Sequence, residues 1–248
     1  TICGVEFPWP KACAGLPVAQ FRKNVIGCKI TAIERRGKYI IFRTGPAWFT
    51  VHLRMTGHLY PAEAGFDRNY VTFCCRLDRG QYLVFRDQRK FGRVTWMNSL
   101  KHLDEKLGPE PLSSEFTEQW LLHQFKSRKR QIKALLLDQA FIAGLGNIYV
   151  DEALWHAKIH PKAISITIGK VRCIKLCIAI KDILSSAIKH KGTTIIDYSY
   201  GSNEKGRFKK ELKVFGRINN TCLRCSRSIV KIFVSQRGTY YCNKCLPV

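Results

Sequence analysis

The sequence predicts an α+β protein built from two different halves, and three observations predict it. Residues 1–97 alternate apolar and polar side chains in the manner of β-strands, with glycine-rich turns between the runs. From Ser113 onward, apolar residues recur three and four positions apart, which is typical of helices. The chain then ends in two pairs of cysteines. We expect a β-sandwich or barrel followed by a helical domain that ends in a metal-bound hairpin.

The first half shows the strand pattern most clearly in three runs. They are Lys38–Arg43, Trp48–Leu53 and Gln81–Arg86. Glycines and one Gly-Pro step separate these runs, as expected of tight turns. This half therefore favours a β-sandwich or a barrel.

The second half has four segments with helical periodicity. They are Glu115–Lys126, Ile132–Gln139, Ile148–Ala157 and Ile166–Lys191. Before them, the segment 107–112 has the proline and glycine density of a linker. We predict a β-domain over residues 1–106, a helical domain over 107–216 and a small metal-binding domain over 217–248.

The two cysteine pairs are the strongest chemical signal. Their members are Cys222, Cys225, Cys242 and Cys245, in the spacing C-x2-C-x16-C-x2-C. Two such turns place four thiolates around one zinc ion at about 2.3 Å, which completes a tetrahedron. Residues between the pairs alternate as a β-hairpin with Arg237 at its tip. We predict one structural Zn²⁺.

Two disulfides are the alternative for these cysteines. The other seven of the eleven cysteines are scattered through apolar segments, an odd number without framework spacing, as in a reducing compartment. Because the first residues lack a basic and then apolar leader pattern, we expect no secretory leader, and no apolar run approaches the length of a membrane span. We expect thiols that bind a metal, in a cytoplasmic protein that does not associate with membranes.

The charge identifies the class of partner. Forty-two Lys and Arg residues against 18 Asp and Glu residues give a net charge of +24 in a chain that is 46% hydrophobic. A folded protein with this surplus is typical of polyanion binders, and nucleic acid is the commonest polyanion. Ribosomal-type and membrane-surface proteins are alternatives, but long basic tails and a basic amphipathic helix are not evident. We expect a duplex to bind between the two halves.

Gly144-Leu-Gly-Asn147 is the most informative loop of the helical half. It lies between two expected helices, so its glycines allow a tight turn with amides pointing outward at a helix N-terminus. An ordinary interhelical turn is the alternative. The basic segment 126–130 and Lys133 nearby favour phosphate binding.

Nine separated motifs, in order, resemble the formamidopyrimidine-DNA glycosylase family over essentially the whole chain. Besides the cysteine hairpin, they are Arg35–Tyr39, His52–Gly57, Asp87–Gly92, Leu107–Pro111, Lys133–Gln139, Gly144–Tyr149, Asp151-Glu152 and His160-Pro161. The resemblance implies an N-terminal β-sandwich, a helix-two-turns-helix domain and a zinc finger. It also implies a monomeric DNA-repair enzyme, nucleoid-associated, acting on double-stranded DNA that contains oxidised bases or abasic sites.

The reaction implied by this resemblance is base excision. Such an enzyme flips an oxidised purine, such as 8-oxoguanine or a formamidopyrimidine, out of the duplex and cuts its glycosidic bond. It then acts as a lyase on the abasic strand by β/δ-elimination. The resemblance assigns Met55, Arg89 and Phe91 to the hole that the flipped nucleotide leaves.

The resemblance also assigns catalytic and phosphate-binding residues. Lys38 matches the proton donor of β-elimination, and Arg237 matches an arginine of δ-elimination. Because arginine is a poor acid, we expect Arg237 to grip the leaving phosphate. The remaining assigned DNA contacts are Lys129, Lys133, Asn147 and Tyr70, although the family usually has histidine at the last position. The lesion-reading loop matches Ser199–Lys210, with Arg207 where an aromatic residue is frequent.

The sequence departs from the family at its start. The family begins with proline, whose secondary amine attacks the sugar, followed by a glutamate and a helix. Thr1–Val5 resembles the strand that comes next. We therefore expect this sequence to be an incomplete copy of an active glycosylase and lyase, and we expect the polypeptide with this sequence to be impaired in activity. The alternatives are a non-catalytic binder of damaged or abasic DNA, and a relative that reads another oxidised base.

Overall fold

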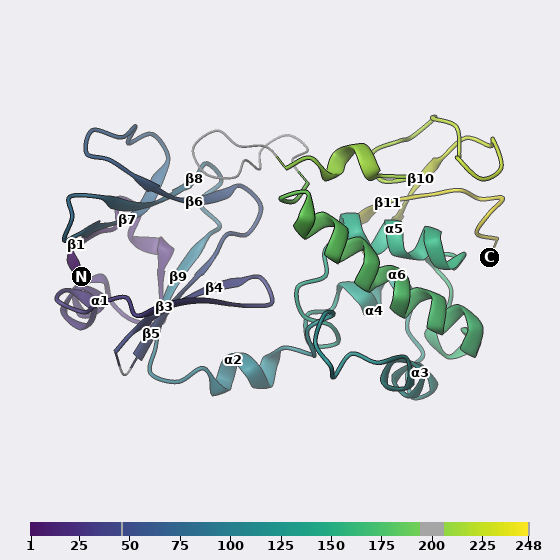
Figure 1. Cartoon of the computed structure of the whole chain (residues 1–248), viewed down its shortest axis with the longest axis horizontal. Helices are drawn as coiled ribbons and strands as arrows, with labels where there is room; N and C mark the ends of the chain where they lie inside the picture. The colour runs from purple at the N-terminus through teal and green to yellow at the C-terminus, as the bar shows by residue number, and fades with distance from the viewer. Residues whose placement is uncertain (46, 194–205, 248) are drawn as a thin grey trace. The chain divides into compact units, whose positions relative to one another are not determined.

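The computed structural model describes residues 1–45, 47–193 and 206–247, which form two compact units. Unit 1 comprises Thr1–Asp104 and Thr193–Gly206, and unit 2 comprises Glu105–Gly192 and Arg207–Val248. Figure 1 shows the helices and strands of both units, and each unit contains its own hydrophobic core.

Unit 1 contains two β-sheets. One has four antiparallel strands in the order β1 (Ile2–Glu6), β7 (Val71–Leu77), β8 (Tyr82–Asp87) and β6 (Gly57–Ala62). The other has five strands in the order β2 (Cys13–Ala14), β9 (Arg93–Met97), β5 (Ala47–His52), β4 (Tyr39–Thr44) and β3 (Ala32–Arg36). Only β2 with β9 is a parallel pair among these described strands. Two separate sheets confirm the predicted sandwich.

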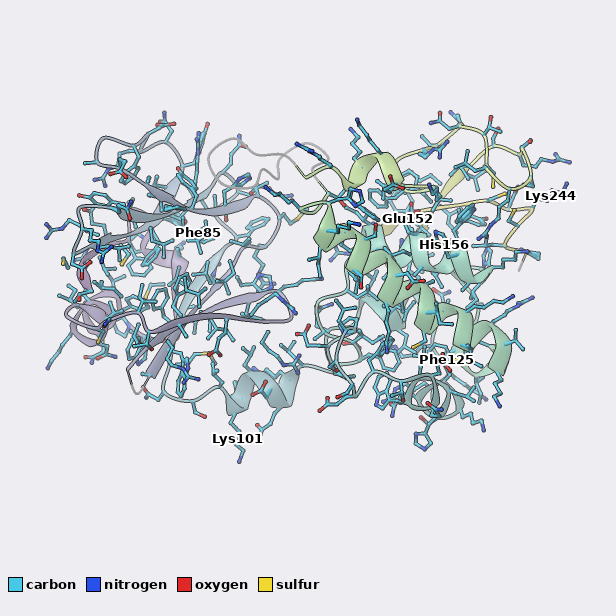
Figure 2. All side chains as sticks on the ribbon, in the orientation of Figure 1. Phe85, Lys101, Phe125, Glu152, His156 and Lys244 are labelled. Carbon is cyan, nitrogen blue, oxygen red and sulfur yellow. The ribbon has the colours of Figure 1, made fainter. Side chains whose placement is uncertain are left out.

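Aromatic side chains fill the interior of unit 1. Phe49 from β5 and Phe73 from β7 are fully buried, and the Phe21 ring packs edge-on against both at 6.0 and 6.2 Å. Phe85 from β8 lies among the same buried side chains (Figure 2). Phe21 belongs to α1 (Val18–Val25), a helix that the sequence reading missed. It is short, begins after Pro17 and buries only two of its residues.

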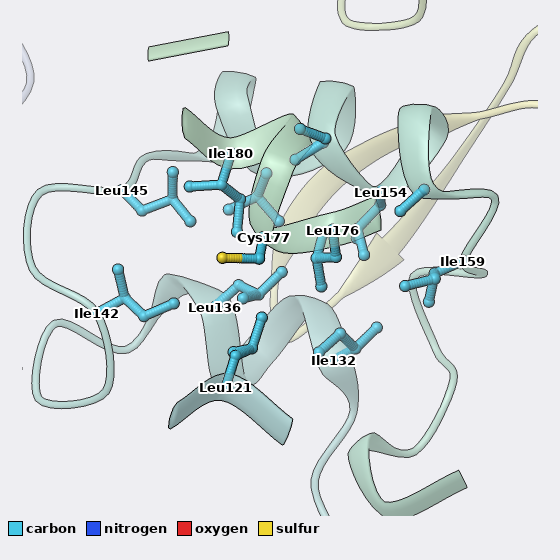
Figure 3. Close-up of a cluster of buried hydrophobic side chains, with 14 of the residues drawn as sticks. Leu121, Ile132, Leu136, Ile142, Leu145, Leu154, Ile159, Leu176, Cys177 and Ile180 are labelled. Carbon is cyan, nitrogen blue, oxygen red and sulfur yellow. The ribbon is translucent and has the colours of Figure 1, made fainter. Parts of the chain in front are cut away.

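Unit 2 is helical apart from its C-terminal hairpin. Its helices are α3 (Glu118–Lys126), α4 (Ile132–Leu137), α5 (Asn147–Ala157) and α6 (Lys170–Lys189), while α2 (Lys101–Lys106) spans the boundary between the units. The core of unit 2 includes Leu136 from α4, Leu154 from α5 and Leu176 from α6 (Figure 3). The four predicted helices are present; three are shorter than predicted, and α5 begins one residue earlier, at Asn147.

The helix ends differ from the prediction for local reasons. Thr117 starts α3 later than expected, because its side-chain oxygen accepts the Trp120 N–H at 3.1 Å and caps the helix. Residues Ser165–Thr167 form a separate short 3-10 helix, η2, and α6 begins after Gly169. A second 3-10 helix, η3 (Phe208–Glu211), precedes the hairpin, and another, η1 (Pro10–Ala12), lies in unit 1.

The C-terminal hairpin consists of β10 (Val230–Val234) and β11 (Arg237–Tyr241). Its turn is Ser235-Gln236, with φ values of 48° and 60° that match a type I′ turn. Arg237 is therefore the first residue of β11 rather than the turn itself. None of the described helices combines the length and apolar character needed to cross a bilayer.

Candidate nucleic-acid interface

Met55, Arg89 and Phe91 form one connected and exposed group in unit 1. Met55 lies in the turn between β5 and β6 and is 61% exposed, while Phe91 follows β8 and is 48% exposed. The guanidinium of Arg89 joins them, because Nη1 lies 3.1 Å from the Met55 Sδ and Cζ lies 4.8 Å from the Phe91 ring centroid. The structure thus brings together the three residues predicted to fill the space of a flipped nucleotide. We call this group the wedge.

Tyr70 is exposed in the turn directly before β7. Its φ of 61° is unusual for a bulky residue, and the Arg86 guanidinium lies 5.7 Å from its ring centroid. Its carbonyl oxygen accepts the Asp87 N–H at 2.9 Å, which connects Tyr70 to the strand that precedes Arg89 and Phe91.

Lys38 is exposed in the two-residue turn between β3 and β4, where Gly37 has a φ of 57°. The positive charge of Lys38 acts on His52, a residue of β5. Burial, with the positive charges of Arg54 and Lys38, lowers the pKa of His52 to about 4. His52 is therefore neutral at physiological pH, and its Nδ1 accepts the Arg54 N–H at 3.1 Å. Arg54 and Lys38 thus place two positive charges near His52, at the base of the Met55 turn.

In unit 2, Lys133 and Asp151 form a buried ion pair. The Lys133 Nζ lies 2.5 Å from the Asp151 Oδ1, and both side chains are 0% exposed. The second oxygen of Asp151 accepts the Tyr240 N–H at 2.9 Å. Burial raises the pKa of Asp151 to about 6, although Lys133 acts in the opposite direction. Burial also lowers the pKa of Lys133.

The same network holds the strand that carries Arg237. The carbonyl oxygen of Gly238 accepts hydrogen bonds from the Asn147 Nδ2 at 2.9 Å and from the Lys133 Nζ at 3.2 Å. The Oδ1 of Asn147 is buried without a hydrogen-bond partner among the described residues. Phosphate contacts by Asn147 and Lys133 remain predictions. In the structure, the Lys133 ammonium is buried and bound within the protein.

Lys129 is exposed between α3 and α4, where a basic segment is fixed to the rest of unit 2. The Ser165 hydroxyl donates to the Arg128 carbonyl oxygen at 2.6 Å, and Arg130 pairs with Asp138 at 2.8 Å. Exposed Lys129 therefore lies in an anchored segment, and its phosphate contact stays a prediction.

Among the described residues, the four C-terminal cysteines lie close enough together to hold one metal ion. Their Sγ atoms all lie within 4.8 Å of one another, with separations of 3.9 Å for Cys222–Cys245 and 3.4 Å for Cys225–Cys242. A zinc tetrahedron with Zn–S bonds of about 2.3 Å has S–S edges of about 3.8 Å. Disulfide sulfurs would lie at about 2.05 Å. The four cysteines therefore fit one structural zinc, with no coordination position left for substrate.

Sequence reasoning assigned no role to Glu152, although it lies in a matched motif. This buried carboxylate, labelled in Figure 2, accepts the backbone N–H groups of Lys213, Val214 and Phe215 at 2.8 to 2.9 Å. Burial raises its pKa, against the effect of these three donors. Glu152 thus anchors the segment that leads into the zinc hairpin. The available signal was an acidic pair, Asp151-Glu152, inside a mostly apolar helix.

The predicted lesion-reading loop Ser199–Lys210 lies partly outside the described residues, which resume at residue 206. Within the described part, the Arg207 N–H donates to the His190 carbonyl oxygen at 2.9 Å, and Phe208 is buried with its ring 5.9 Å from that of Tyr149. The end of this loop is therefore attached to the helical core.

Three family models match the chain. Residues 1–94 match the formamidopyrimidine-DNA glycosylase N-terminal domain, residues 107–199 match the formamidopyrimidine-DNA glycosylase H2TH domain, and residues 220–248 match the zinc finger found in FPG and IleRS.

Individual relatives match over nearly the whole chain. The formamidopyrimidine-DNA glycosylase of Chloroflexus aggregans is 40% identical, over 99% of this chain and 90% of the relative. That of Symbiobacterium thermophilum is 42% identical, over 98% of this chain and 82% of the relative.

Solved structures of the Lactococcus lactis enzyme have the same fold. Its complex with DNA containing an abasic site has a TM-score of 0.92 at 34% identity, covering 100% of this chain and 92% of that one. Its complex with DNA containing Fapy-dG has a TM-score of 0.92 at 33% identity, covering 100% and 93%. This chain therefore belongs to the formamidopyrimidine-DNA glycosylase family.

Proposed function

We propose that the protein is a base-excision repair DNA glycosylase with AP lyase activity. It removes oxidised purines, namely 8-oxoguanine and formamidopyrimidines, from double-stranded DNA by base flipping and cleaves the abasic strand by β/δ-elimination. Support comes from the family, from relatives solved with Fapy-dG and abasic-site DNA, and from the net charge of +24. The single observation that carries the proposal is the wedge, because exposed Met55 and Phe91 are joined by Arg89.

The wedge has the chemistry that an extruded nucleotide demands. Flipping leaves a cavity in the stack and an orphaned base that has lost its hydrogen-bond partner. Met55 offers a flexible apolar side chain, and Phe91 offers a ring that can stack or pry apart a base step. The Arg89 guanidinium lies between them and can donate hydrogen bonds to the orphaned base. Together these groups replace the stacking and the pairing that flipping removes.

The catalytic assignments are part of the same proposal. Lys38 is the proton donor of β-elimination, and Arg237 grips the phosphate that leaves in δ-elimination. The exposure of both side chains supports this: Lys38 lies in a tight turn and Arg237 directly after one. The remaining DNA contacts are made by Tyr70, Lys129, Lys133 and Asn147. For Lys133, this requires an opening of its buried ion pair.

We also propose the organisation and setting of the protein. Residues 1–106 form the catalytic β-sandwich domain, 107–216 the helix-two-turns-helix domain and 217–248 the zinc finger. The protein acts as a monomer in the cytoplasm, in association with the nucleoid. Its zinc stabilises the hairpin that carries Arg237.

Strand incision tests the function. The product of the gene, expressed from its own start codon, is incubated with duplexes that carry 8-oxoguanine, an abasic site or neither. We expect release of 8-oxoguanine and incision of the first two duplexes, with the undamaged one intact. Binding of both damaged duplexes without incision would instead support the non-catalytic alternative.

Salt dependence tests the mode of binding. Each neutralised phosphate contributes a slope of about −0.9 to the log–log plot of affinity against salt. We expect affinity to fall steeply with salt. An affinity that stays constant from low to moderate salt would contradict a cationic DNA-binding surface.

A further inference from the structure

Asp87, the last residue of β8, has a fully buried carboxylate directly beneath the exposed wedge. Its Oδ1 accepts the Thr56 hydroxyl at 2.5 Å and the Arg89 N–H at 3.2 Å, and its Oδ2 accepts the Gly92 N–H at 2.6 Å. These donors come from both wedge segments, since Thr56 follows Met55 and the two amides flank Phe91. One side chain thus joins the two turns that carry the wedge.

The backbone of Asp87 extends the connection. Its N–H donates to the Tyr70 carbonyl oxygen at 2.9 Å, and its carbonyl oxygen accepts the Lys90 N–H at 3.1 Å. Tyr70 and Lys90 both have left-handed backbone conformations, with φ values of 61° and 58°. The residue therefore holds two unfavourable turns in place in addition to the Met55 turn.

Phe85, two residues earlier on the same face of β8, is the floor on which both turns rest. A Cβ atom added to Gly57 would lie 2.7 Å from the Phe85 ring and 2.3 Å from the Leu53 carbonyl oxygen. A Cβ atom added to Gly92 would lie 2.2 Å from the same ring. Both glycine backbones are thus in direct contact with Phe85, which fixes the height of each turn above the sheet.

We propose that Asp87 is a positioning residue for lesion recognition, because it sets the relative placement of Met55, Arg89 and Phe91. The inference rests on the proposed function, since this placement matters to DNA only if the wedge enters the space of a flipped nucleotide. Without the carboxylate the two turns would be joined less tightly, through the Arg89 N–H bond to the Thr56 hydroxyl oxygen at 3.3 Å and their contacts with Phe85. The wedge would then have to be ordered at the expense of binding to damaged DNA. Binding to intact duplex depends on phosphate contacts and should not require this order.

Two variants test the role. Asp87→Asn replaces one acceptor oxygen by an NH2 group, which would face a hydroxyl or a backbone N–H that also donates. Thr56→Val removes the hydroxyl that donates to Asp87 and accepts the Arg89 N–H at 3.3 Å, and it keeps the carboxylate. Glu63→Gln is the matched control for loss of one negative charge, because Glu63 is exposed and accepts from the Gln81 Nε2 at 3.2 Å. Arg89→Ala tests the wedge directly.

The measurement compares a duplex that carries a stable abasic-site analogue with an intact duplex, and places 2-aminopurine opposite the lesion. We expect Asp87→Asn to weaken binding to the damaged duplex about 10- to 100-fold, as for loss of a buried hydrogen bond to a charged group. Affinity for intact duplex should stay within about twofold. The 2-aminopurine fluorescence change should shrink, because it reports insertion of the wedge. Thr56→Val should act in the same direction with a smaller effect, and Glu63→Gln should behave as wild type.

The outcomes separate the inference from the proposed function. If Arg89→Ala leaves binding to damaged DNA unchanged, the proposed function of the wedge is wrong. If Arg89→Ala weakens it but the Asp87 and Thr56 variants keep wild-type affinity and fluorescence, the positioning role is overturned. An equal loss for damaged and intact duplexes would also overturn it, because that result indicates a general structural role. Should Asp87→Asn fail to fold, Thr56→Val decides the question.

Discussion

Each unit of the protein supports its proposed DNA-contacting residues with a buried aspartate, but the two aspartates are stabilised by different partners. Asp87 in unit 1 accepts hydrogen bonds from a hydroxyl and two backbone amides. Asp151 in unit 2 pairs with the ammonium of Lys133 and accepts one backbone amide. Neutral donors satisfy a carboxylate without burying a second charge, whereas an ion pair requires that both charges be removed from water.

The two supports also differ in how far along the chain they reach. The Asp87 carboxylate binds donors at most 31 residues away, all within one sandwich. Asp151 joins Lys133, 18 residues earlier, to Tyr240, 89 residues later. Unit 1 therefore fixes its contacts through short turns that are bound to one strand, β8. Unit 2 fixes Arg237 by tying a hairpin distant in sequence to α4 and α5, and so depends on the zinc that folds that hairpin.

Loss of zinc should produce the largest difference between the two units. Binding of a structural zinc contributes about 10 kcal/mol or more to the folding of such small domains. We expect Cys242→Ser to unfold the hairpin and abolish DNA binding, with hydrogen-exchange protection lost over Val230–Tyr241 and retained over β4 to β8. Cys3→Ser, at an exposed cysteine outside the metal group, is the control. Retention of DNA binding and incision after metal loss would contradict the role assigned to the hairpin.

Removing one partner of the ion pair should have the next largest effect. Lys133→Met leaves the Asp151 carboxylate buried without its cation, at an expected cost of about 3–5 kcal/mol in the free energy of unfolding. Lys133→Met with Asp151→Leu removes both charges and should recover most of that loss. Asp87→Asn should cost less, about 1–3 kcal/mol, because no charge is stranded.

Urea unfolding at neutral pH measures these differences. The contrast between the units would be wrong if the Asp87 and Lys133 variants lost equal stability. It would also be wrong if the double variant were no more stable than Lys133→Met alone.

Disturbing the contact between the wedge turns and Phe85 should cause a smaller loss of stability than breaking the ion pair. Gly92→Ala places a methyl group against the Phe85 ring and should cost about 1–3 kcal/mol, as for overpacking of a core. Phe85→Leu frees space, so the double variant should lose less than the sum of the single losses. Gly4→Ala is the control, because its Cβ would meet only ordinary contacts at 3.6 Å or more. Strict additivity would show that Gly92 does not rest on the ring.

Motif spacing predicted the parts of the site that depend on neighbours in the sequence. The C-x2-C pairs predicted the zinc group because each knuckle is local, and alternating runs predicted the sandwich strands. The wedge residues were predicted from resemblance alone, yet their motifs already contained Asp87, Gly57 and Gly92. What could not be predicted was that one strand, β8, supports both turns, because that depends on the pairing of β6 and β7 with β8.

Long-range tertiary contacts explain the rest. A lysine in a basic stretch is expected at the surface, so nothing local in the sequence indicated that Lys133 would be buried against Asp151. The three backbone amides on Glu152 come from residues 61 to 63 positions away. The helix α1 was missed because eight residues with two buried positions give a weak periodic signal.

The smallest expected effect concerns pH and the Met55 turn. That turn depends on a second acceptor, the Nδ1 of His52, which binds the Arg54 N–H. With a folded pKa of about 4 against about 6.5 when unfolded, the native state binds fewer protons than the unfolded state between these values. The part of the stability that depends on neutral His52 is therefore fully present above the unfolded pKa and is lost as pH falls toward 4.

Allowing for partial solvent screening, we expect the free energy of unfolding to fall by about 1 kcal/mol between about pH 7 and about pH 5. His52→Asn keeps an acceptor at the Nδ1 position but does not titrate, so its urea unfolding should lack this part of the pH dependence. Identical pH dependence in the two proteins would show that folding does not lower the pKa of His52.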